Sequence, residues 1–197
     1  MASSPSPAVT ESSDNLPRSF ALLSMSLSSA AIAAQVAALS LPALGAPGGV
    51  SRSLVVVAGG GRDLAWSPAR IASQLLARTG GRAVHLLLHG GARGADQAIA
   101  RAADQLGWYA LSLPAEWHLY GRGAGPIRNR QLLEQALAVA QARCTASSAV
   151  SVLVVAFPGG SGTASLVKQV RRLASRSPVP LAVMEVSPAF GAPSALG

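Results

Sequence analysis

The stretch VSVLVVAFPGGSGTASLVKQV, residues 150–170, combines a strand, a glycine-rich turn and the beginning of a helix. Residues 150–157 are apolar except for Ser151 and rich in valine, which is typical of a strand buried on both faces of a sheet. The run ends at Pro158, and three glycines follow before helix-forming sequence resumes. This order predicts a strand–turn–helix unit of a parallel sheet.

The same pattern repeats along the chain from residue 52 onward. Ser67 and Pro68 suit the N-cap and first position of a helix. Strands are predicted at 53–58, 83–89, 108–114, 150–157 and 179–186, and helices at 67–78, 94–106, 127–142 and 162–175. Such alternation predicts an α/β fold, a Rossmann-like three-layer domain with about five parallel strands and helices on both faces.

The chain divides near residue 50. Residues 1–18 are rich in Ser and Pro and predict a disordered polar tail, whereas 19–50 lack charge and predict an apolar helix followed by a Gly/Pro linker. Residues 51–187 form the predicted domain, and 188–197 a flexible tail. The apolar helix could dock on the domain or a partner subunit, serve as a signal or anchor, or span a membrane. Its serines, and the acids that precede Arg18, favour docking.

The chain has 197 residues and a net charge of +8, carried almost entirely by arginine, since Lys168 is its one lysine. Arginine suits planar recognition of phosphate or carboxylate, although a basic chain also attracts nucleic acid. The single Cys144 excludes an internal disulfide, and His85 and His118 lack metal-ligand spacing. His89, at the end of a predicted strand, is expected to make a polar contact near the site. We therefore expect a cytoplasmic protein with no metal.

Glycines follow the first, second and fourth predicted strands. Ligands of parallel sheets bind outside the carboxyl ends of the strands, where glycine permits positive φ and lets backbone N–H groups approach an anion. Thr163 could cap the following helix or give its hydroxyl to a phosphate. The loops match neither the G-x-G-x-x-G dinucleotide pattern nor a Walker A motif, so no cofactor is predicted.

Charged side chains accompany these loops. Arg128, within AGPIRN (124–129), is expected in the first turn of a helix, where it would bind phosphate. Arg93 and Arg122 also lie beside glycine-bearing turns. Asp96 either complements the dipole of its helix or accepts a hydrogen bond from a ribose hydroxyl.

Three motifs in this order carry a resemblance: GGARGAD (90–96), PAEWHLYGRGAGPIRN (114–129) and AFPGGSGT (156–163). They resemble the YspA/cpYpsA-related branch of the SLOG superfamily, which also contains the Lonely Guy phosphoribohydrolases and DNA-processing protein A. The resemblance covers residues 53–186 and implies a Rossmann-like fold that binds a nucleotide or its derivative.

The Lonely Guy enzymes cleave the glycosidic bond of nucleoside 5′-monophosphates with the signature P-G-G-x-G-T-x-x-E and an upstream arginine. The resemblance places Arg128 as that arginine, but the glutamate position holds Leu166. A carboxylate stabilises the oxocarbenium-like state of such cleavage, and leucine cannot. Glu116, beside Trp117, or Asp96 would have to replace it.

The favoured hypothesis is a sensor or carrier module that binds a phosphorylated nucleoside or nucleotide-derived small molecule and forms a homodimer. One alternative is an N-glycosidase with Arg128 and Glu116 as catalytic residues. A nucleic-acid-binding protein is less favoured, because no aromatic residues line a basic stripe. The predicted ligand-binding residues are Gly59, Gly60, Arg62, Gly90, Gly91, Arg93, Asp96, Arg122, Arg128, Asn129, Pro158, Gly159, Gly160, Gly162 and Thr163.

Overall fold

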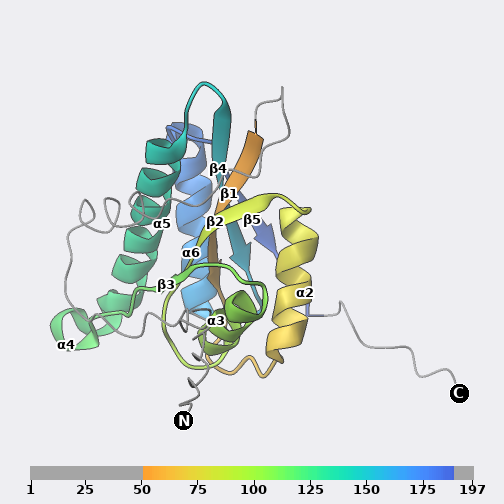
Figure 1. Cartoon of the computed structure of the whole chain (residues 1–197). Coiled ribbons are helices and arrows are strands. Elements are labelled where there is room, and N and C mark those ends of the chain that lie inside the picture. The colour runs from red at the N-terminus through yellow and green to blue at the C-terminus, as the bar shows by residue number, and fades with distance from the viewer. Residues whose placement is uncertain (1–50, 189–197) are drawn as a thin grey trace, which may run out of the picture.

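One parallel sheet organises the computed structural model, which describes residues 51–188 (Figure 1). Its strands are β1 (Ser51–Gly59), β2 (Ala83–His89), β3 (Ala110–Ser112), β4 (Ser148–Ala156) and β5 (Leu181–Glu185). They are ordered β3-β2-β1-β4-β5, and every pair is parallel. The predicted tail at 1–18, the helix and linker at 19–50, and nearly all of the tail at 188–197 lie outside the described residues.

Helices cover both faces of the sheet, which confirms the predicted three-layer, Rossmann-like α/β fold. Helices α2 (Pro68–Thr79) and α3 (Ala95–Gln105) pack together on one face, and α5 (Ala124–Arg143) and α6 (Ser161–Leu173) pack together on the other (Figure 1). The short elements are α4 (Trp117–Tyr120) and the 3₁₀ turns η1 (Gly121–Gly123) and η2 (Ala174–Arg176). Within residues 51–188, no helix is both long and apolar enough to cross a membrane.

The core consists of two apolar layers that alternate along the strands. In β1, Val55 and Val57 face the α5 and α6 side, whereas Leu54 and Val56 face the α2 and α3 side. All four are almost fully buried. Burial on both faces explains why the central strands are apolar throughout instead of alternating with polar residues.

Helix α2 begins as its sequence predicts. The Ser67 side chain accepts a hydrogen bond from the backbone N–H of Arg70 at 3.3 Å, and Pro68 is the first helical residue. The helix ends at Gly80, whose φ of 59° is the left-handed conformation that favours glycine.

Three elements differ from the prediction. Helix α4 lies where a loop was expected. The strand expected at 108–114 is reduced to Ala110–Ser112 on the sheet edge, although Tyr109 and Leu113 still hydrogen-bond to β2. Helix α5 begins at Ala124 instead of Ile127, because Pro126 is tolerated within a first turn that needs no N–H donor there. Arg128 therefore lies in the second turn of α5, and its prediction as a first-turn residue was wrong.

Candidate functional site

The loops that follow β1 and β4 are in direct contact at the point where the strand order reverses. The N–H of Gly61 donates to the carbonyl of Pro158 at 2.9 Å, and that of Phe157 donates to the carbonyl of Gly59 at 2.8 Å. A Cβ on Gly61 would lie 3.0 Å from the Cα of Gly159. Position 61 therefore requires glycine, because the backbones of the two loops are in contact and leave no room for a side chain between them.

The start of α3 packs against the same loops. The N–H of Ala95 donates to the carbonyl of Gly61 at 3.1 Å, and a Cβ on Gly60 would lie only 2.7 Å from the Cβ of Ala95. Gly94 has a φ of 73° and approaches the backbone carbonyl of Arg62. The glycine loops therefore meet at one sheet edge, although positive φ is confined to Gly91 and Gly94 among them.

The N-terminus of α6 is open. Its N-cap is Gly160, no side chain caps it, and its first turn contains no acidic residue. The first helical bond is from Ala164 to the carbonyl of Gly160, so the N–H groups of residues 161–163 are not used within the helix. Gly160 and Gly162 are exposed, and a Cβ on either would meet no atom of the described chain within 4 Å.

Thr163 does not cap α6, so the capping alternative for this residue was wrong. Its hydroxyl instead lies against Gly159, where a Cβ would overlap it. The same Cβ would also lie 2.6 Å from the backbone nitrogen of Gly61, which cannot rotate away, so position 159 requires glycine.

Helix α5 is fixed against the beginning of α6. The buried Asn129 side chain donates from Nδ2 to the carbonyl of Gly162 at 3.0 Å. From α6, Gln169 donates to the carbonyl of Pro126 at 3.1 Å. Asn129 therefore orients the Ser161–Thr163 turn through its backbone.

Arg128 extends from α5 across the carboxyl end of β2. Its guanidinium occupies the space that a Cβ on Gly90 would need, and Nη1 lies 3.6 Å from Oδ2 of Asp96 on α3. The same Oδ2 accepts a hydrogen bond from the N–H of Ala92 at 3.0 Å. The side chains of Arg128 and Asp96 are 15% and 5% exposed, so the pair is largely buried.

Burial and neighbouring charges act in opposite directions on this arginine. Burial lowers the pKa of Arg128, the Asp96 carboxylate raises it, and the positive charge of Arg62 lowers it further. Nε of Arg128 is buried without a hydrogen-bond partner within the described part of the chain. The positive charge of Arg62 thus acts on Arg128 beside one buried carboxylate, an arrangement that an anionic ligand would stabilise.

His89 supports the loop that follows β2. Its Nδ1 accepts a hydrogen bond from the N–H of Gly91 at 3.2 Å, which places the proton of the neutral ring on Nε2. Burial lowers the pKa of His89; the carboxylates of Asp96 and Asp104 raise it, and Arg128 lowers it. The ring is therefore neutral at pH 7.

Three predicted site residues are not joined to this cluster by a hydrogen bond or ion pair. Arg93 and Arg122 are exposed, and neither makes an ion pair with another residue in 51–188. Glu116 lies half-buried at the start of α4, but the carboxylate that Arg128 contacts is that of Asp96. Arg62 lies 4.9 Å from the centre of the Trp117 ring.

Leu166, which the sequence resemblance aligned with a glutamate, is 3% exposed and belongs to the core layer beneath α5 and α6. Its Cδ2 lies 3.4 Å from where a Cβ on Gly59 would be. This position therefore faces the core below the loops.

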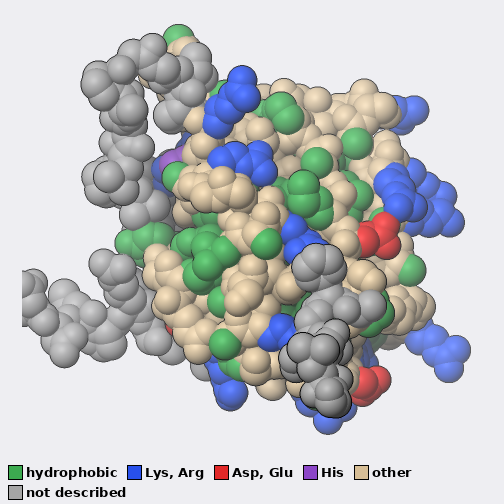
Figure 2. Space-filling view, turned by 90° about the vertical axis from the view of Figure 1, so that its right-hand side faces the viewer, with side chains coloured by type: hydrophobic (Ala, Val, Ile, Leu, Met, Phe, Trp, Pro, Cys, Tyr) green, Lys and Arg blue, Asp and Glu red, His purple; other side chains and the backbone are tan. Residues whose placement is uncertain are grey.

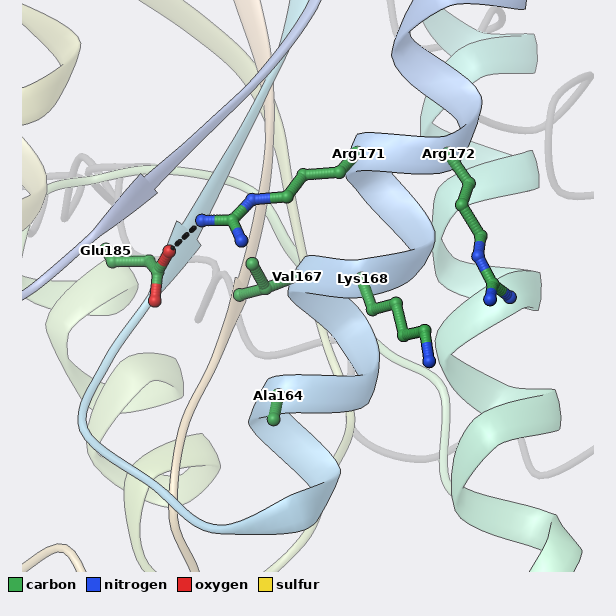
Figure 3. Close-up of a pocket in the computed structure, with 6 residues that line it drawn as sticks. All are labelled: Ala164, Val167, Lys168, Arg171, Arg172 and Glu185. Carbon is green, nitrogen blue, oxygen red and sulfur yellow. Dashed lines mark hydrogen bonds and ion pairs between the residues drawn. The ribbon is translucent and has the colours of Figure 1, made fainter.

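Two surface depressions lie beside the loop between β4 and α6, on the side that faces β5. One depression, of about 190 Å³, includes Pro158, Gly159 and Thr163. A second, of about 450 Å³, continues along α6 past Lys168, Arg171 and Arg172 to Glu185. In Figure 3, Arg171 points to Glu185, to which it is bonded at 2.7 Å, while Lys168 and Arg172 point the other way. Sequence reasoning did not place Glu185 near the loop, because only the strand order brings β5 beside β4.

Basic side chains are spread over the face of the molecule that Figure 2 shows. On the face shown in Figure 2, lysine and arginine outnumber the acids but do not gather into one stripe. Among the described residues, no group of three or more His, Cys, Asp or Glu could hold a metal ion.

Comparisons of the chain with protein-family models, curated proteins and solved structures gave no match.

Proposed function

We propose that this protein binds a phosphorylated nucleoside or nucleotide-derived ligand at the carboxyl edge of its sheet, as a sensor or carrier. The observation that carries the proposal is the open N-terminus of α6. It combines backbone N–H groups that have no partner within the helix, a Gly160 N-cap, an exposed Gly162 and no acid in its first turn. Such a turn has the positive end of the helix dipole and is suited to a phosphate.

The charges at this sheet edge support the same proposal. Asp96 offsets one positive charge, so Arg128 and Arg62 together keep an excess. The ion pair with Asp96 and the close contact with Gly90 also hold the Arg128 guanidinium in place in the absence of a ligand. A group held in place in this way binds an anion without first losing side-chain freedom. The SLOG resemblance of the three motifs points to the same ligand class.

A charge change at Gly162 tests the phosphate site. Gly162→Asp places a carboxylate in the first turn of α6, where the dipole stabilises it but where it repels a bound phosphate. Gly162→Asn is the matched neutral control, because it has nearly the size of aspartate and a Cβ at this position would meet no atom of the described chain within 4 Å. The probes are inorganic phosphate and nucleoside mono- and diphosphates, measured by isothermal titration calorimetry and thermal shift.

We expect wild type and Gly162→Asn to bind the same nucleotide, with an affinity at least tenfold higher than that of Gly162→Asp. A ligand at 100 times its Kd stabilises the native state by about 2.7 kcal/mol, which is large enough to detect as a rise in Tm. Equal affinities of the Asp and Asn variants for the nucleotide would show that the phosphate does not bind at the N-terminus of α6. Release of free base during incubation, detected by chromatography, would instead favour the N-glycosidase hypothesis.

A further inference from the structure

Trp117 is an exposed aromatic side chain that the phosphate site does not use. It lies on α4, with 48% of its surface exposed, beside Leu119 and Tyr120, which are also exposed. Large aromatic rings usually bury most of their surface, and an exposed ring near a candidate site has area available for a ligand.

Two contacts hold the Trp117 ring at the edge of the site. A Cβ on Gly125, near the start of α5, would lie 3.5 Å from Cη2 of the ring. The Arg62 guanidinium, on the loop after β1, lies 4.9 Å from the ring centre, within the range of a cation–π contact. Arg62 also acts electrostatically on Arg128, so the ring borders the same cluster of charge.

Helix α5 links this ring to the phosphate-binding turn. Gly125, which borders the ring, and Asn129, which holds the carbonyl of Gly162, are about 6 Å apart along the helix axis. Figure 1 shows α4 beside the first turn of α5, at the end of the molecule where the strands terminate. Both contacts involve the first two turns of α5, so the ring and the phosphate-binding turn adjoin the same end of this helix.

We infer that Trp117 is the stacking platform for the base of the ligand, with the phosphate at the N-terminus of α6. The inference rests on the proposed function and narrows the ligand to a nucleotide that retains its base, with purines preferred because they offer a larger ring. Stacking needs no hydrogen bond to the base edge, so a partly exposed ring is sufficient. Arg62 and Gly125 position the ring.

The test compares ligands with and without a base. Adenosine 5′-monophosphate, uridine 5′-monophosphate and ribose 5-phosphate are titrated into wild type, Trp117→Ala, Trp117→Tyr and Tyr120→Ala of the full chain. Tyr120 is the matched control, because it lies on the same helix and is equally exposed at 48%. Thermal unfolding verifies that each variant is folded.

Trp117→Ala is expected to weaken adenosine monophosphate binding by about 5- to 150-fold, the measured range for loss of one stacked base. It should leave ribose 5-phosphate binding within about twofold, and Trp117→Tyr should retain most of the affinity. Tyr120→Ala should bind all three ligands as wild type does.

The outcomes separate two failures. If ribose 5-phosphate binds wild type but the base adds no affinity, or if Trp117→Ala binds adenosine monophosphate normally, only the stacking inference is wrong. If neither nucleotide nor ribose 5-phosphate binds wild type, the proposed function fails together with it. If Trp117→Ala changed the oligomeric state in solution but not the affinity for the ligands, the ring would instead belong to a protein interface.

Discussion

Gly90 shows how a single residue determines the position of the main cation of the site. Because Gly90 has no side chain, the Arg128 guanidinium can occupy the space above it and reach Asp96. Gly90→Ala should therefore displace Arg128 and leave Asp96 buried with a weakened partner. We expect the free energy of unfolding to fall by about 1–3 kcal/mol, as in other overpacked interiors, measured by urea denaturation.

Gly125→Ala is the matched glycine control. A Cβ there makes only an ordinary 3.5 Å contact and lies within a helix, so stability should be unchanged or slightly higher. Equal stabilities of Gly90→Ala and wild type would show that Arg128 has another position available.

His89 makes the free energy of unfolding depend on pH. Burial lowers its pKa below the ordinary value of 6.5, and burial also lowers that of His85. As pH falls through 6.5, the unfolded chain takes up protons before the native state does, so stability is lost toward acid. The slope is at most about 1.4 kcal/mol per pH unit for each histidine.

His89→Asn isolates this contribution, because the asparagine oxygen can accept the Gly91 N–H in place of Nδ1. Asp96, Arg128 and Asp104 remain around the position in both proteins. Urea unfolding between pH 5 and pH 8 should give a shallower decline for the variant. Parallel curves for the variant and wild type would show that His89 is not responsible.

At the scale of elements, α2 and α6 begin in opposite ways. Helix α2 is capped by Ser67, whereas α6 has no side-chain cap. Ser67→Ala should cost about 1 kcal/mol of stability, because the N–H of Arg70 loses its acceptor. Ser73→Ala, within the exposed face of the same helix, should be neutral or slightly stabilising in thermal unfolding. An equal loss in both variants would mean that the cap contributes nothing specific.

The elements that the sequence predicted well are those with strong local signals. Ser67 with Pro68 defined the start of α2, and the valine-rich runs defined β1 and β4. Helix α4 and the start of α5 were missed, because GRGAG (121–125) reads as loop and Pro126 reads as a boundary. Tertiary packing of Ala124 and Asn129, both buried, overrides that local preference.

The site was predictable only in part, for a reason that belongs to the whole molecule. Glycine loops after parallel strands must meet at one edge, so their convergence follows from strand order. The Arg128–Asp96 pair and the Arg62–Trp117 contact join segments from different layers or loops, and side-chain directions across layers have no signal in the sequence.

We expect the whole chain to be a homodimer. Light scattering coupled to size exclusion should give twice the monomer mass of 19.8 kDa. The apolar segment at 19–50 is expected to contribute, so a chain that lacks residues 1–50 should dissociate more readily. A monomeric full chain whose mass state is unchanged by that deletion would contradict the expectation.

The most direct test of phosphate binding at the N-terminus of α6 is a titration of ¹⁵N-labelled protein with a nucleoside monophosphate, followed by backbone amide resonances. The amides of Ser161, Gly162 and Thr163 should shift most, because their N–H groups bind the phosphate. Shifts confined to the depression beside Lys168 and Arg171, or no shifts, would contradict it.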